Sequence, residues 1–285
     1  MILDRRHRPF QFLALATVLV GLVPAALGAS LADPVLLAGA YLAWTVAVYL
    51  GGAAGTLLAA TTFAPGEPMR PGWLLLAGSY AVLVPARLLA GADGSGLAET
   101  ATRLPAVISL ASILSSALAV AGFLVLTRAW GAAGLDTASF ASRATATTTR
   151  LVALLVGVAL AGPDLVERFP RMLAGDTMAL ADVVADVLDV ALFVVAVPVL
   201  RAARALGGGL VAWPWALLTL SLLAWLGYDA SVTWPDAAGL SARHARVIQE
   251  TMRALAACAA LAAGVAQRWI MLGPPGSARD APPPA

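Results

Sequence analysis

The sequence predicts an all-α integral membrane protein with eight transmembrane helices, and three observations lead to this fold class. Hydrophobic residues make up 60% of the chain and charged residues 12%, whereas soluble domains average about 45–50% and about 25%. The mean hydropathy is +0.86. Apolar stretches long enough to cross a hydrocarbon core of about 30 Å recur along the 285 residues, and the connections between them are rich in proline and glycine.

The first apolar stretch, Phe10–Leu27, follows the basic segment Arg5–Arg8. It fits either a first spanning helix or a signal peptide that is cleaved near Ser30, which would remove residues 1–29. The hydrophobic part of a signal peptide usually has about 7–15 residues, and this stretch is longer. Its length therefore favours an uncleaved helix.

Seven further stretches complete the predicted bundle. Because a helix rises by about 1.5 Å per residue, each stretch can cross the hydrocarbon core of a bilayer. They are Pro34–Phe63, Gly72–Ala90, Leu104–Trp130, Arg150–Val166, Met178–Leu206, Leu210–Thr233 and Val247–Leu272. We expect one membrane domain over residues 1–272, followed by a proline-rich, disordered tail over residues 273–285.

The placement of arginine predicts the orientation. All 18 basic residues are arginine, and an even number of spans puts both termini on one side of the membrane. With the termini in the cytoplasm, eleven arginines lie on the cytoplasmic side, as the positive-inside rule requires. Twelve of the sixteen acidic residues lie on or toward the outer side. We therefore expect both termini in the cytoplasm and the protein in the inner (plasma) membrane.

The second half of the chain also resembles the first half at a nearly constant offset. Trp73 and Trp215 lie in similar segments, and Asp33 and Asp176, separated by almost the same offset, each precede a predicted helix. This pattern predicts two parallel four-helix repeats, with halves at residues 1–135 and 145–272.

The residue inventory argues against several kinds of chemistry. The absence of lysine excludes a retinal Schiff base and P-loop nucleotide binding. Two histidines and one cysteine supply too few ligands for haem, zinc or iron–sulfur sites, so we expect no cofactor and no metal. No nucleophile and base stand in a recognisable catalytic arrangement, so we name no catalytic residue, and a lipid-active enzyme is only a third choice.

The expected partners follow from the same composition. The arginines are scattered along the chain rather than clustered, which gives no signal for nucleic acid. The lipid bilayer is the first partner of such an apolar chain. A second copy of the chain or other membrane subunits are the further partners to test.

The candidate site begins with an acidic stripe. Asp182, Asp186 and Asp189 stand at i, i+4 and i+7, which places them within about 60° of one another on a helix. Ionisable side chains inside a spanning helix are costly, and they indicate a function by default. The helical rise puts charges of other predicted helices at a similar depth, about 18–22 Å from their cytoplasmic ends. These charges are Asp164, Asp229, Arg87 and Arg253, with Glu250 nearer the outer interface.

Three interpretations of this charged layer stay open. The two arginines could pair with aspartates and only hold the bundle together. The surplus of carboxylates could instead bind a cation or proton. The layer could also simply face the outer interface.

The leading hypothesis is a protein that binds a cation or proton, and in its stronger form translocates it. Its expected ligands are Asp186 and Asp189 at the centre, with Asp164, Asp229 and Asp182, while Arg87 and Arg253 serve as counter-charges. The alternative is a non-transporting membrane sensor, or an accessory or scaffold subunit of a larger membrane complex.

Overall fold

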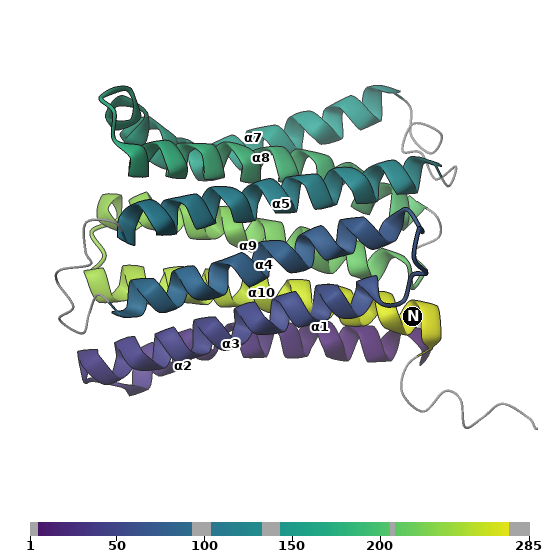
Figure 1. Cartoon of the computed structure of the whole chain (residues 1–285), viewed down its shortest axis with the longest axis horizontal. Coiled ribbons are helices and arrows are strands. Elements are labelled where there is room, and N and C mark those ends of the chain that lie inside the picture. The colour runs from purple at the N-terminus through teal and green to yellow at the C-terminus, as the bar shows by residue number, and fades with distance from the viewer. Residues whose placement is uncertain (1–4, 93–103, 133–142, 206–208, 274–285) are drawn as a thin grey trace, which may run out of the picture.

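The computed structural model of the chain describes residues 5–92, 104–132, 143–205 and 209–273. All regular secondary structure in these ranges is helical, and the long helices run side by side along the longest axis of a bundle (Figure 1). The elements are η1 (Arg5–His7), α1 (Arg8–Gly21), α2 (Val23–Ser30), α3 (Pro34–Ala60), α4 (Met69–Ala92), α5 (Leu104–Ala132), α7 (Arg143–Leu173), α8 (Thr177–Ala205), α9 (Ala212–Ala237) and α10 (Ala242–Leu272). Of the predicted disordered tail, only Gly273 lies within the described residues.

Six stretches of the described residues are long and apolar enough to cross a membrane. This all-helical, apolar makeup is that of a multi-pass membrane protein. The six are Arg8–Ser30, Pro34–Ala60, Met69–Leu89, Val107–Ala132, Thr147–Leu173 and Ala242–Leu272. The helices α8, which carries three aspartates, and α9 are of similar length but are not among the six. Eight transmembrane spans therefore stay a prediction.

Two of the predicted spans differ from the observed helices in an instructive way. The first span is broken at Leu22 into α1 and α2, because Pro24 at the start of α2 has no N–H to continue the hydrogen-bond pattern of α1. The span predicted to end at Val166 continues as α7 to Leu173. This extension brings Arg168 into the helix.

Two aspartates begin helices in equivalent ways. The backbone N–H of Val35 donates to Asp33 Oδ1 at 2.8 Å, and that of Met178 donates to Asp176 Oδ1 at 2.9 Å. The hydrogen bond from Ala179 N–H and the guanidinium of Arg171 hold the pKa of Asp176 below its ordinary value. These are the two aspartates that match in the proposed repeat, although the repeat itself stays a prediction.

The helix α10 occupies the middle of the bundle and packs against α9, α3, α1 and α2. Its run from Ala256 to Ala260 is buried, because small side chains let neighbouring helices approach closely. The approach is closest between Gly264 and Gly55 of α3, where a Cβ on Gly264 would collide with the Gly55 carbonyl.

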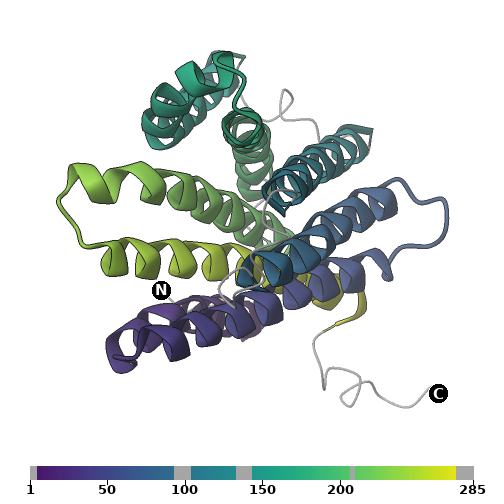
Figure 2. The same ribbon diagram turned by 60° about the vertical axis from the view of Figure 1, so that its left-hand side comes forward.

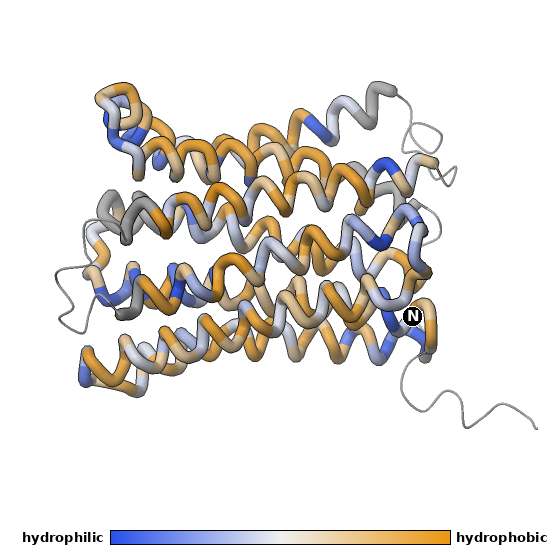
Figure 3. Tube along the Cα trace, viewed as in Figure 1, coloured by the Kyte–Doolittle hydropathy of each residue, from blue (hydrophilic) through white to orange (hydrophobic). Residues whose placement is uncertain are grey.

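The two ends of the bundle differ in composition. At one end, where α1 begins and α10 ends (Figure 1), the buried side chains of Trp73, Trp130 and Trp215 pack together with a large apolar cluster. We call this the tryptophan end. The opposite end carries Asp33 and Asp176 at the starts of α3 and α8, and we call it the acidic end. Apolar residues fill most of the length between the two ends (Figure 3).

Candidate functional site

A cavity of about 170 Å³ lies inside the bundle, between α4, α5, α8 and α9. Because α8 begins and α9 ends at the acidic end, the aspartates near those termini put the charged part of the cavity in the acidic half of the bundle. Its charged lining consists of Asp164, Arg168, Asp182, Asp186, Asp189 and Asp229. Its other polar lining residues are Thr56, Ser79, Tyr80, Ser112, Ser115, Ser116, Ser221, Trp225 and Tyr228.

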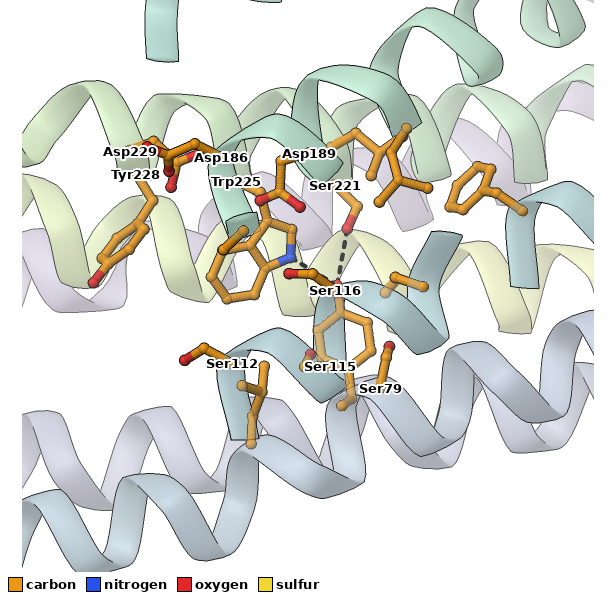
Figure 4. Close-up of a pocket in the computed structure, with 18 of the residues that line it drawn as sticks. Ser79, Ser112, Ser115, Ser116, Asp186, Asp189, Ser221, Trp225, Tyr228 and Asp229 are labelled. Atoms are coloured by element: carbon orange, nitrogen blue, oxygen red, sulfur yellow. Dashed lines mark hydrogen bonds between the residues drawn. The ribbon is translucent and has the colours of Figure 1, made fainter. Parts of the chain in front are cut away.

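The five aspartates singled out in the sequence all line this one cavity. The three of the acidic stripe come from α8, whose helical period turns them to the same side. Asp229 comes from α9 and Asp164 from α7. Three helices therefore build one acidic wall, part of which is visible in Figure 4.

The helix α7 lies at the edge of the bundle and packs mainly on α8 and α9 (Figures 1 and 2). Its buried positions Ala153, Gly157, Ala161 and Asp164 recur at helical spacing. The three small residues let α7 approach α8 closely, since a Cβ on Gly157 would stand 3.0 Å from Val190. This packing turns Asp164 inward, although most of the α7 surface is exposed and apolar.

Arg168 is the cation of the acidic wall. Its Nε donates to Asp164 Oδ1 at 2.7 Å, and its Nη1 forms an ion pair with Asp182 of α8. The sequence prediction missed this arginine because it ended the helix at Val166. Its spacing of four residues from Asp164 is the signal that could have found it, because such residues are neighbours on a helix.

Arg87 and Arg253 were expected to neutralise the aspartates, but the structure gives them a different partner. Glu250 Oε1 lies 2.6 Å from Arg87 Nη2 and 2.8 Å from Arg253 Nη1. The hydroxyl of Thr45 donates to Glu250 Oε2 at 2.8 Å. For Arg253 the reason is local, because Glu250 precedes it by three residues on α10 and is therefore its neighbour on the helix surface. We call these four residues the Glu250 cluster.

Tyr228 connects the Glu250 cluster to the cavity. Its hydroxyl accepts a hydrogen bond of 2.8 Å from Arg253 Nη2, and the guanidinium carbon lies 4.6 Å from the centre of its ring. Tyr228 itself lines the cavity and directly precedes Asp229 on α9. One side chain therefore both contacts the Glu250 cluster and lines the cavity.

Three carboxylates of the acidic wall have no arginine partner within the described ranges, namely Asp186, Asp189 and Asp229. Asp186 is 4% exposed and Asp229 is 8% exposed. The Oδ2 atom of each is buried without a hydrogen-bond partner among the residues described.

Hydroxyl groups form the wall opposite these carboxylates. Figure 4 shows Ser79 of α4 and Ser112, Ser115 and Ser116 of α5 facing Asp186, Asp189 and Asp229 across the cavity. Trp225 lies between the two walls, and its Nε1 donates to Tyr80 Oη at 3.4 Å. The wall thus combines hydrogen-bond acceptors with an aromatic face.

Comparison of the chain with models of protein families, with curated proteins and with solved structures finds no match. The functional proposal is therefore based on the residues that line the cavity.

Proposed function

We propose that this multi-pass membrane protein binds a cation or a proton in the cavity of the acidic half. Asp186, Asp189 and Asp229 are the central groups of this site. Arg168 keeps Asp164 and Asp182 in place beside them. In the proposed orientation the protein lies in the inner membrane, with the tryptophan end toward the cytoplasm and the cavity in the extracytoplasmic half.

The observation that supports this proposal is the unbalanced charge of the cavity. Burying a carboxylate is costly unless a counter-charge, a proton or water compensates it. Among the described residues, the one arginine that lines the cavity is already paired with Asp164 and Asp182. Asp186, Asp189 and Asp229 therefore depend on something that enters the cavity, and a positive charge compensates them most directly.

Translocation is the stronger form of the proposal, and it requires the other half of the bundle to open. Leu76, Phe123 and Leu222 line the cavity and belong to the apolar cluster that continues to Trp130 and Trp215. The rings of these two tryptophans pack edge to face, with centroids 5.4 Å apart. A transporter would have to separate these side chains during its cycle.

The same packed cluster favours a second candidate function. A membrane sensor, or an accessory subunit of a larger complex, needs a binding site but no path through the bundle. Binding at the cavity without flux would assign the protein to this class.

The experiment that tests the proposal compares the full-length protein with its Asp189→Asn variant in liposomes that enclose a pH-sensitive dye. We expect the wild type to give a signal that depends on an imposed proton or cation gradient, and we expect Asp189→Asn to abolish it. Asp33→Asn is the matched control, because Asn also begins helices well and Asp33 lies outside the cavity. An unchanged signal in Asp189→Asn would contradict the proposal.

A further inference from the structure

The size of the cavity bears on the kind of cation that it holds. Metal ions in proteins are contacted by several ligand atoms at about 2.0–2.6 Å. Within the described ranges, no three Asp, Glu, His or Cys side chains converge closely enough to hold a metal ion. The carboxylates are instead spread along a cavity of about 170 Å³. Such a space fits a molecule of several heavy atoms better than a single dehydrated ion.

The free carboxylates occupy two positions in the cavity. Asp186 and Asp189 lie one turn apart on α8 and both line the cavity, as does Asp229 of α9 (Figure 4). The helical rise separates the backbones of Asp186 and Asp189 by about 4.5 Å along α8. Among the described residues, no hydrogen-bond donor meets the buried Oδ2 atoms of Asp186 and Asp229. Two carboxylates at separate positions are best neutralised by a ligand with two positive groups.

The remaining walls suit an organic cation. The indole of Trp225 lies near Asp189, between the carboxylates and the serine hydroxyls (Figure 4). An aromatic face attracts an ammonium group and also packs well against an alkyl chain. The hydroxyls of Ser112, Ser115 and Ser116 can accept hydrogen bonds from N–H groups that the carboxylates do not use.

We propose that the cavity binds a small aliphatic diamine, with one ammonium group at Asp186 and the other at Asp189. In extended 1,4-diaminobutane the two nitrogens are about 6 Å apart, as standard bond lengths dictate, which suits two carboxylate positions on adjacent turns of α8. The diamine neutralises two of the three unpaired carboxylates, Asp186, Asp189 and Asp229. This inference rests on the proposed function and narrows its ligand to one chemical class.

The test measures the thermal unfolding of the purified full-length protein with five separate additives at matched ionic strength. They are 1,4-diaminobutane, 1-aminobutane, butane-1,4-diol, NaCl and CaCl₂. A ligand that binds the native state raises the unfolding temperature in a concentration-dependent way. We expect the diamine to act at concentrations at least about tenfold lower than the monoamine, since it makes a second ion pair, and we expect no effect of the diol.

The variants locate the second ammonium group. Asp189→Asn should remove the advantage of the diamine over the monoamine, whereas Asp33→Asn should keep it. Ser116→Ala serves as a milder variant if Asp189→Asn fails to fold, and we expect it to weaken the effect of the diamine.

The outcomes separate this inference from the proposed function. The diamine inference is wrong if the monoamine and the diamine are equally potent. It is also wrong if NaCl or CaCl₂ stabilises the protein and the diamine does not. Both results leave the proposed binding of a cation intact. If Asp189→Asn abolishes a proton-dependent liposome signal but the amines have no effect on unfolding, the diamine inference is wrong and the proposed function stands. If no additive stabilises the protein and no liposome signal depends on Asp189, both proposals fail.

Discussion

Arg168 holds two carboxylates of different helices, Asp164 on α7 and Asp182 on α8. Its side chain is 19% exposed, and that of Asp164 is 3% exposed. Removing one partner of a buried ion pair leaves the remaining charge without compensation, which is the costly way to break such a pair. The position of α7 against α8 therefore depends on this one guanidinium as well as on apolar packing.

We predict that Arg168→Gln lowers the free energy of unfolding by about 3 kcal/mol, because it leaves Asp164 buried without its counter-charge. The measurement is chemical unfolding of the purified protein. Arg171→Gln is the matched control on the same helix, and it should change stability little because the side chain of Arg171 is 59% exposed. Equal stability of Arg168→Gln and the wild type would show that the pair does not hold α7 in place.

The residues of the site were predictable to different degrees. A stripe at i, i+4 and i+7 fixes which side chains share a helix face, so Asp182, Asp186 and Asp189 could be grouped from spacing alone. Depth along each helix also brought Asp164 and Asp229 to the same level. Which arginine meets which carboxylate depends on how the helices are rotated about their axes, and sequence spacing does not give this rotation. The pairing of Arg87 with Glu250 across α4 and α10 is an example.

Helices α3 and α10 cross where both have glycine. The Gly55 carbonyl lies where the side chain of any other residue at position 264 would begin, and a Cβ on Gly55 would meet the backbone of Leu261 at 2.6 Å. Backbone atoms cannot move aside as a flexible side chain does. Any larger residue at this crossing must therefore push the two helices apart.

We predict that Gly264→Ala lowers the free energy of unfolding by about 2 kcal/mol through this overpacking. Gly39→Ala in α3 is the control, because a Cβ there meets no atom within 4 Å. The control should be neutral or slightly stabilising, since alanine favours helices more than glycine does. Thermal unfolding of the two variants side by side decides the matter. A Gly264→Ala variant as stable as Gly39→Ala would mean that the crossing is looser than described.

At the scale of elements, the sequence predicted the existence of the long helices better than their ends. Long apolar stretches identify helices because the backbone of a chain in lipid has to satisfy its own hydrogen bonds. Proline does not always end a helix, since Pro163 and Pro170 lie inside α7, whereas Pro24 coincides with a break in the first span. Proline removes one hydrogen bond in each case, and the packing around it decides whether the helix continues. The local sequence does not predict this packing.

In the whole molecule, α1 begins and α10 ends at the tryptophan end (Figure 1), and the aspartates of the cavity lie in the other half. The side of the membrane that each end faces follows from the arginine bias and is still a prediction. The chain offers a convenient way to test it, because its one cysteine, Cys258, is buried. Single cysteines introduced at exposed positions can then report the two ends separately.

We predict that, in a Cys258→Ala background, a membrane-impermeant maleimide labels Ser30→Cys in intact cells, because Ser30 is exposed at the acidic end. Thr61→Cys is its counterpart, exposed after α3 at the tryptophan end. It should react only after the membrane is made permeable. The reverse labelling pattern would show that the orientation is opposite to the predicted one, with the aspartates of the cavity in the cytoplasmic half.

Tyr228 gives the bundle a means of long-range communication. Its ring lines the cavity while its hydroxyl accepts from Arg253, which shares Glu250 with Arg87 of α4. A ligand that displaces Tyr228 therefore disturbs an electrostatic network that extends to α4 and to Thr45 of α3. Thermodynamic linkage makes such an effect reciprocal. A perturbation at Arg87, such as a partner subunit or a lipid headgroup, would then change affinity in the cavity by the same free energy.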